Sequence, residues 1–126
     1  MLMLKIYTDK APKPIGPYSQ AVLAGGLIFI SGQLGIDPQT GELNHGIEEQ
    51  TRQALINISH ILAQAGSSLS GIVNVSAYIT NMDEYQLFNN IYTEFFMDHA
   101  PSRSVVGVSA LPRNALVEIE AVALVS

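Results

Sequence analysis

The chain of 126 residues and 13.6 kDa has the size of one domain, taken as residues 1–126, and such a domain buries roughly two thirds of its unfolded surface. Eleven acidic residues against six basic ones give a net charge of −5, so nucleic acid is not an expected partner, because its binding depends on clustered lysine and arginine. The absence of cysteine excludes disulfides and metal sites built on thiolates.

The hydropathy of the chain predicts neither a signal peptide nor a membrane-spanning segment. The apolar run at residues 1–4 is too short for a signal peptide, and no later run reaches the roughly 18 apolar residues of a membrane span. We therefore expect a cytoplasmic protein with no membrane contact. Charged residues make up only 13%, below the roughly 25% usual for soluble domains, so part of the apolar surface is expected to meet another subunit.

The first third of the chain predicts an extended segment followed by a hairpin. Residues 11–17 hold three prolines and a glycine, which exclude a helix. Residues 18–23 and 27–31 are strand-like, and Gly25-Gly26 between them predicts a tight turn.

The middle of the chain predicts a turn, a helix and a strand. Proline and glycine favour a turn at residues 37–41. An amphipathic helix is predicted over residues 47–65, ended by Gly66, because its apolar positions recur every three or four residues: Ile47, Ala54, Leu55, Ile58, Ile61, Leu62 and Ala65. Residues 72–80 alternate with a period of two and predict a strand.

A second helix and two further strands complete the predicted order. Asn81 with Glu84 three residues later resembles a helix cap. The apolar stripe behind it is typical of core rather than of a cofactor or base-stacking surface: Tyr85, Leu87, Phe88, Ile91, Tyr92, Phe95 and Phe96. Strands are predicted from about residue 103 to 108 and from 116 to 125, joined by a turn at 111–114.

The predicted order β-β-α-β-α-β-β indicates an α+β fold, with a mixed β-sheet and two helices packed on one face. Both faces of the last strand are largely apolar: Leu116, Val122 and Leu124 share one side with Glu118 and Glu120, and Val117, Ile119, Ala121, Ala123 and Val125 form the other. Two helices hide only one face, so we expect self-association through the second.

Arg103 is a candidate anion-binding residue. It is one of three arginines and lies in an otherwise strand-like apolar stretch, and a guanidinium binds a carboxylate through two parallel hydrogen bonds. A small carboxylic acid is therefore the first ligand hypothesis. The alternative is a structural ion pair between Arg103 and Glu118 or Glu120, because buried charges are rare unless paired.

Glu118 and Glu120 are predicted on the same side of the last strand, with β-carbons about 7 Å apart. If Arg103 from a neighbouring strand or another subunit opposes one of them, an anion clamp lies beside a general base. Glu120 could equally be an acidic edge in solvent. Tyr18, Ser31 and Gly32 are weaker candidates, each with an ordinary structural explanation. No metal site is proposed, because His45, His60 and His99 lack ligand spacing.

Five blocks of the sequence together resemble the RidA (YjgF/YER057c/UK114) family of reactive-intermediate deaminases. They occur in family order and nearly span the chain: IGPYSQ at 15–20, ISGQ at 30–33, NNIYTEFF at 89–96, PSRS at 101–104 and VEIEA at 117–121. The resemblance implies a chorismate-mutase-like fold assembled as a homotrimer, with sites in the clefts between subunits.

The same resemblance implies a hydrolase of the 2-iminobutanoate/2-iminopropanoate deaminase type. Such enzymes hydrolyse enamines and imines such as 2-aminoacrylate, released by pyridoxal-phosphate enzymes, to a 2-oxo acid and ammonia, and they need no cofactor. By motif, Arg103 would bind the substrate carboxylate and Glu118 would position or activate water. Tyr18, Ser31, Gly32 and Asn89 would line the site.

The chain departs from the family pattern at two places. Val105 stands where many members have cysteine, which puts thiol chemistry in doubt, and the segment 98–101 is shorter than in common members and could alter side-chain preference. The alternative function is a non-catalytic trimer that binds small carboxylates or proteins, with a regulatory, chaperone-like or translation-inhibitor role. A ribonuclease is a third hypothesis, disfavoured by the acidic charge.

Overall fold

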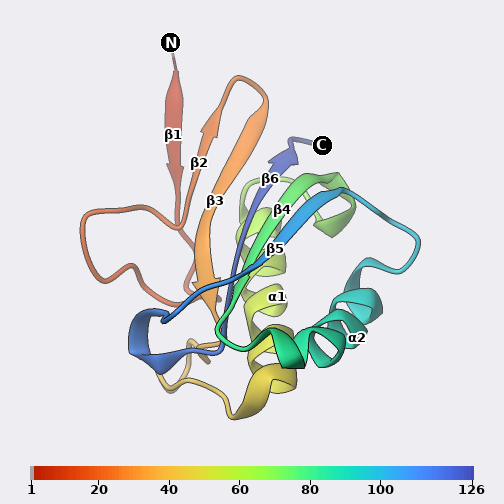
Figure 1. The fold of residues 1–126 in the computed structure, drawn as a ribbon. Coiled ribbons are helices and arrows are strands. Elements are labelled where there is room, and N and C mark those ends of the chain that lie inside the picture. The colour runs from red at the N-terminus through yellow and green to blue at the C-terminus, as the bar shows by residue number, and fades with distance from the viewer. Residues whose placement is uncertain (1) are drawn as a thin grey trace.

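The computed structural model describes residues 2–126, which form one six-stranded β-sheet with two helices against it (Figure 1). The strands are β1 (Met3–Ile6), β2 (Ala21–Ala24), β3 (Leu27–Leu34), β4 (Ile72–Ile79), β5 (Ser102–Gly107) and β6 (Val117–Leu124). The helices are α1 (Gly46–Gln64) and α2 (Tyr85–Phe96). None of the helices in residues 2–126 has the length and apolar character that a membrane crossing requires.

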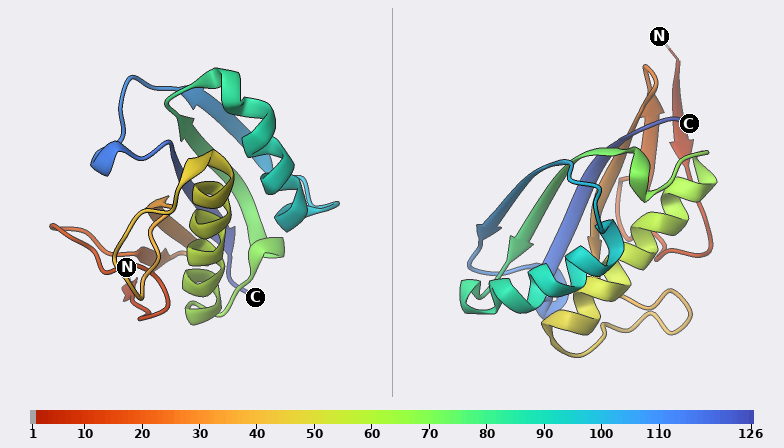
Figure 2. Two further views of the ribbon diagram at one scale, coloured as in Figure 1. Left: turned by 90° about the horizontal axis from the view of Figure 1, so that it is seen from below. Right: turned by 90° about the vertical axis from the view of Figure 1, so that its right-hand side faces the viewer.

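The sheet is mixed, with the strand order β1-β2-β3-β6-β4-β5. All neighbouring strands are antiparallel except β4 and β5, which are parallel. Helix α2 connects this parallel pair, and α1 connects β3 to β4, so β6 inserts between the strands that α1 joins. Both crossovers place their helices on the same side of the sheet (Figure 2), which confirms the predicted two-layer α+β architecture.

The hydrophobic core lies between the helices and this face of the sheet. Helix α1 buries most of its predicted stripe, with Ala54, Leu55 and Ile58 fully buried. Gly66, with a φ of +82°, ends the helix, and the backbone N–H of Ser67 donates to the carbonyl of Leu62 at 2.8 Å, as in a Schellman motif. Helix α1 therefore packs its apolar face on the sheet, and α2 contributes Phe88, Tyr92 and Phe96 to the same core.

A sixth strand, β1, was missing from the predicted order. Met3 to Ile6 pair with β2 at the edge of the sheet, and Met3 and Leu4 remain 57% and 46% exposed. An edge strand with exposed apolar residues has no alternating burial pattern, so periodicity does not reveal it. The strand predicted from residue 18 begins instead at Ala21.

Two other local features differ from the prediction. Strand β3 continues past residue 31 to Leu34, through a register shift between Ile30 and Gln33 in its pairing with β6. Asn81 caps the short 3-10 turn Met82–Glu84, accepting a hydrogen bond from the Asp83 N–H at 3.0 Å, rather than capping α2 directly. Both cases depend on local geometry that residue types do not specify.

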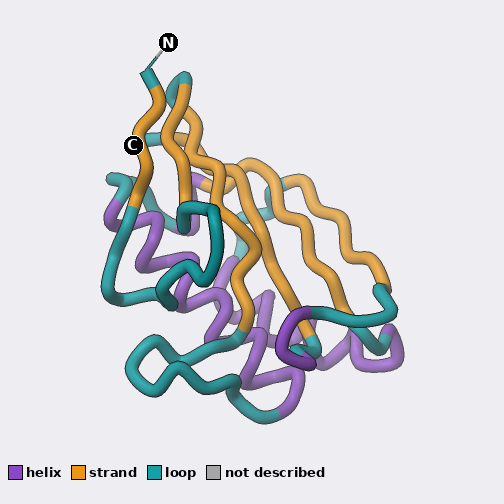
Figure 3. Tube along the Cα trace, turned by 90° about the vertical axis from the view of Figure 1, so that its left-hand side faces the viewer, coloured by secondary structure: helices purple, strands orange, loops and turns teal. Residues whose placement is uncertain are grey.

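The second face of the sheet has no covering layer among residues 2–126 (Figure 3). Its strands present exposed apolar side chains, including Phe29 at 46%, Leu124 at 52% and Val106 at 43%. The predicted apolar character of this face is confirmed, and we call it the open face. Self-association through the open face stays a prediction.

Candidate functional site

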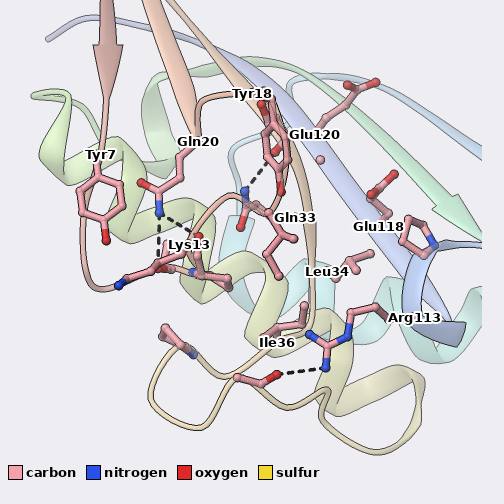
Figure 4. A pocket seen from close by; sticks show the side chains of 18 of the residues that line it. Tyr7, Lys13, Tyr18, Gln20, Gln33, Leu34, Ile36, Arg113, Glu118 and Glu120 are labelled. Atoms are coloured by element: carbon pink, nitrogen blue, oxygen red, sulfur yellow. Dashed lines mark hydrogen bonds between the residues drawn. The ribbon is translucent and has the colours of Figure 1, made fainter.

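A cavity of about 1060 Å³ lies beside one end of the open face (Figure 4). Its walls come from the segment that precedes β2, from the second half of β3 and the loop that follows it, from the loop before β6 and from β6 itself. Four predicted site residues line it together: Tyr18, Ser31, Gly32 and Glu118. Glu120 also lines it, so both carboxylates of β6 face the same cavity, as strand alternation predicted.

The β3 bulge positions the wall formed by Ser31 and Gly32. The Ser31 backbone N–H donates to the Gln20 carbonyl at 2.9 Å, and its hydroxyl donates to the Ser19 carbonyl at 2.6 Å. A β-carbon on Gly32 would lie 2.7 Å from Cδ of Glu118. Glycine at position 32 therefore lets the Glu118 carboxyl pack directly against the β3 backbone, and any larger residue there would displace this carboxyl.

Glu118 is a partly buried carboxyl group with an altered acidity. Burial raises the pKa of Glu118 above its ordinary value, and the charge of Glu120 raises this pKa further. Tyr78 lies opposite Glu118 in the β4–β6 register, and its hydroxyl donates to Oε1 of Glu120 at 2.6 Å. Glu120 therefore has a protein hydrogen-bond donor, whereas no donor within residues 2–126 is bonded to the Glu118 carboxyl.

The Arg103 guanidinium lies among polar and aromatic groups of α2. Its Nη1 donates to Oδ1 of Asn89 at 2.8 Å and its Nη2 donates to the hydroxyl of Tyr85 at 2.7 Å. Its Cζ lies 4.6 Å from the centroid of the Tyr92 ring, in cation–π range. Burial raises the pKa of the Tyr92 phenol, so this ring remains neutral beneath the cation at ordinary pH.

The alternative of an internal ion pair between Arg103 and Glu118 or Glu120 is wrong for this chain. Both salt bridges that the structure describes within residues 2–126 belong to Arg52. The reason is the strand register. Val75 of β4 is the partner of both Arg103 and Ala121, so Arg103 lies in the row of the buried Ala121, on the helix side, and the two glutamates alternate to the open face.

The predicted site residues thus form two separate groups in one chain. Tyr18, Ser31, Gly32 and Glu118 line the cavity, and we call this group the carboxylate half-site. Arg103 of β5 and Asn89 of α2 lie together, and we call this group the arginine half-site. The two half-sites lie on opposite faces of the sheet, so a neighbouring strand of the same chain does not bring Arg103 to Glu118.

Two tyrosines that were predicted only as core residues contact the arginine half-site. Tyr85 and Tyr92 belong to the aromatic stripe, yet one bonds Arg103 and the other lies under it. Together with Asn89 they have the spacing i, i+4 and i+7, which places them on one face of a helix. Phenol groups at this spacing beside a polar asparagine were the signal that could have identified them.

Two of the three histidines have contacts with main-chain oxygens. His60 Nδ1 lies 3.0 Å from the Lys10 carbonyl oxygen, and His99 Nε2 lies 2.8 Å from that of Ile72. In the part of the chain that the structure describes, no three histidine, aspartate or glutamate residues cluster with the geometry of a metal site.

Comparison with known proteins identifies the relatives of this chain. The family model described as Endoribonuclease L-PSP matches residues 8–125. A RutC family protein of Pyrococcus horikoshii is 50% identical over 119 residues, which are 94% of each chain. The human 2-iminobutanoate/2-iminopropanoate deaminase is 42% identical over 94% of this chain and 88% of its own length.

Solved structures give the same result for the fold. The Rid protein YyfA of Yersinia pestis is 47% identical and superposes with a TM-score of 0.96, over 98% of this chain and all of the other (100%). TdcF of E. coli, solved with bound serine, is 39% identical with a TM-score of 0.94, over 98% and 99% of the two chains. The fold expected from the resemblance is confirmed, and the chain belongs to the YjgF/RidA family, the family of the Endoribonuclease L-PSP model.

Proposed function

We propose that this protein hydrolyses reactive enamines and imines, such as 2-aminoacrylate released by pyridoxal-phosphate enzymes, to a 2-oxo acid and ammonia. The observation that carries the proposal is the pair of complementary half-sites: a guanidinium held by Asn89 and Tyr85, and a partly buried carboxyl at Glu118 without a protein donor. Human, bovine and mite relatives named as 2-iminobutanoate/2-iminopropanoate deaminases, at 40–43% identity, support this reaction.

The proposed enzyme is a homotrimer in which each site forms between two subunits. Arg103 and Asn89 would come from one subunit, and Glu118 with Tyr18, Ser31 and Gly32 from its neighbour. The separation of the half-sites within one chain supports this arrangement, because neither group alone holds both an anion clamp and a base. The uncovered apolar side chains of the open face give the subunits a surface to bury.

In the proposed mechanism, Arg103 binds the substrate carboxylate through charge-assisted hydrogen bonds and fixes the imine carbon near Glu118. An enamine substrate first tautomerises to the imine by gaining a proton on carbon and losing one from nitrogen. The Glu118 carboxylate then takes a proton from water as the water oxygen bonds to the imine carbon. This proton passes from Glu118 to nitrogen and gives a carbinolamine. The hydroxyl proton of the carbinolamine then moves to nitrogen as the carbonyl forms and the carbon–nitrogen bond breaks, so ammonia and a 2-oxo acid leave.

The acidity of Glu118 suits this proton relay. A carboxyl with a raised pKa is a stronger base than an ordinary glutamate, so the Glu118 carboxylate takes a proton from water more readily. The imine carbon is already electrophilic, so no cofactor is required for attack by water. Ser31 and Gly32 would shape the wall beside the reacting carbon, and Tyr18 would close the cavity rim.

The decisive experiment compares the wild-type protein with Glu118→Gln and Arg103→Ala. Each is incubated with an enzymatic source of 2-aminoacrylate, and the release of 2-oxo acid and ammonia is followed. We expect both variants to lose the acceleration and to remain trimers by light scattering. An unchanged acceleration by Glu118→Gln would remove this carboxyl from the mechanism.

A second candidate function is a non-catalytic trimer that binds small carboxylates. The structure of TdcF with bound serine supports small-molecule binding by a relative, and binding requires Arg103 but not Glu118. This function predicts that Glu118→Gln retains ligand affinity and that the wild-type protein does not accelerate deamination. The ribonuclease implied by the name of the family model is tested by RNA cleavage with highly purified protein.

A further inference from the structure

The Tyr85 hydroxyl is half of the support that holds the Arg103 guanidinium. Tyr85 and Asn89 are one helical turn apart on α2, and each accepts a hydrogen bond from a different terminal nitrogen, at 2.7 and 2.8 Å. The Tyr92 ring lies against the guanidinium, with Cζ 4.6 Å from its centroid. The guanidinium is held by hydrogen bonds to two oxygens and by contact with the Tyr92 ring, so it has little freedom to rotate.

The hydrogen-bond capacity of these groups is not used up. A guanidinium has five N–H donors, of which Tyr85 and Asn89 take two. A phenol both accepts and donates, and Tyr85 accepts from Arg103. Within residues 2–126 no acceptor is bonded to the Tyr85 proton. Free donors of both side chains therefore lie next to each other in a partly buried place.

We propose that Tyr85 is a carboxylate-binding residue of this protein, which orients the Arg103 guanidinium through its oxygen and donates its own proton to the acid group of the ligand. This inference rests on the proposed function, because it concerns the same ligand. A carboxylate offers about four acceptor positions, so a fork from Arg103 and one phenol proton are accommodated together. A ligand without the carboxylate charge gains much less from either donor.

If Tyr85 had a purely structural role, loss of its hydroxyl would have a different effect. In that case its ring fills space and its oxygen only satisfies Arg103, so loss of the oxygen lowers stability without changing which ligands bind. The proposed role instead affects charged ligands selectively. The variant Tyr85→Phe distinguishes the structural role from the ligand-binding role. It removes one oxygen and keeps the ring that packs against Phe88, at a centroid distance of 6.4 Å.

The experiment is calorimetric titration with 2-oxobutyrate and with its neutral amide, 2-oxobutanamide. We expect Tyr85→Phe to bind 2-oxobutyrate about tenfold more weakly than the wild type, the loss expected for a hydrogen bond to a charged group, and the amide within about twofold. In steady-state assays KM should rise by a similar factor, about tenfold, with kcat within about twofold. Gln86→Ala, which alters the exposed neighbouring position on α2, should leave both affinities unchanged.

Three outcomes would overturn the inference. Equal binding of 2-oxobutyrate by the wild type and Tyr85→Phe, with binding lost in Arg103→Ala, removes Tyr85 and leaves the proposed function intact. Equal losses for the acid and the amide indicate a structural role. No binding to the wild-type protein rejects both the inference and the proposed function. Tyr85→Leu, which also lacks the hydroxyl, must reproduce the charge selectivity, and its thermal midpoint reports whether it is folded.

Discussion

Arg103 and Glu118 lie on opposite faces of one β-sheet. Arg103 shares its row with Ala121, which is buried beneath the helices. Glu118 lies three residues from Ala121 along β6, an odd number, so it faces the cavity beside the open face. An anion clamp and a proton acceptor that act on one small molecule must therefore come from two copies of the chain. This relationship makes assembly a condition of the proposed activity.

Mixing two inactive variants tests the shared site. Arg103→Ala and Glu118→Gln, unfolded and refolded together, should recover activity, because some clefts then receive the intact arginine from one subunit and the intact glutamate from the next. Random assembly into rings with head-to-tail interfaces gives about a quarter of the wild-type activity. The 2-aminoacrylate assay measures it. A mixture as inactive as either parent would contradict a site formed between subunits.

Substitution of Gly32 tests the contact between β3 and Glu118. In Gly32→Ala the new β-carbon would lie 2.7 Å from Cδ of Glu118, so the carboxyl must move. We expect kcat/KM to fall more than about tenfold, because a displacement of about 1 Å at a reacting group is costly.

Gly25→Ala is the matched control for this substitution. Nothing lies within 4 Å of a β-carbon there, but the φ of +60° disfavours alanine. This variant should lose about 1 kcal/mol of stability and keep its activity. If the two variants had equal activity, the Gly32 contact would have no functional meaning.

The stability of Glu118→Gln should depend on pH in a defined direction. The pKa of Glu118 is raised in the folded protein, so its protonated form is the one that folding favours. Folding therefore loses stability as the pH rises from the ordinary glutamate pKa through the higher folded value. We expect the thermal midpoint of Glu118→Gln to exceed that of the wild type at pH 7, and the difference to vanish well below the ordinary pKa. A less stable variant at pH 7 would contradict the assigned direction.

Glu120 should influence the pH profile of the reaction through its charge. Burial is the larger cause of the raised pKa of Glu118, and the charge of Glu120 is the second cause. Glu120→Gln removes this charge, so the acid limb of the kcat/KM profile should move to lower pH. The companion variant Tyr78→Phe removes the hydroxyl that donates to Glu120 and leaves the Glu120 charge in place, so its shift should be smaller. An acid limb that moves upward in Glu120→Gln would exclude the proposed coupling.

Met97 should be a site for stabilisation away from the two half-sites. It ends α2 with φ +52° and ψ −117°, a conformation that glycine adopts more easily, and it is 76% exposed. We expect Met97→Gly to gain about 1 kcal/mol in urea denaturation, since relief of backbone strain exceeds the entropy cost of glycine. The proposed activity should not change. A lower urea midpoint would show that the side chain contributes more than the strain costs.

The local pattern of apolar residues was sufficient to predict much of the secondary structure. The apolar repeat predicted α1 to within a residue at each end, 47–65 against Gly46–Gln64, because one face of a helix returns every three or four positions. The β-branched alternation similarly predicted β4, 72–80 against Ile72–Ile79. The common orientation of Glu118 and Glu120 was predictable because it depends only on alternation along one strand.

The sequence by itself determined which residue types are available: one arginine in an apolar strand, two carboxyls in phase on another, and an aromatic stripe on a helix. The tertiary structure decided their relations. The placement of Arg103 and Glu118 on opposite faces of the sheet depends on how β5, β4 and β6 pair. The contact between Gly32 and Glu118 depends on a bulge in β3. Strand register is set by contacts between segments distant in the chain, and a shift of one residue reverses the face of every side chain.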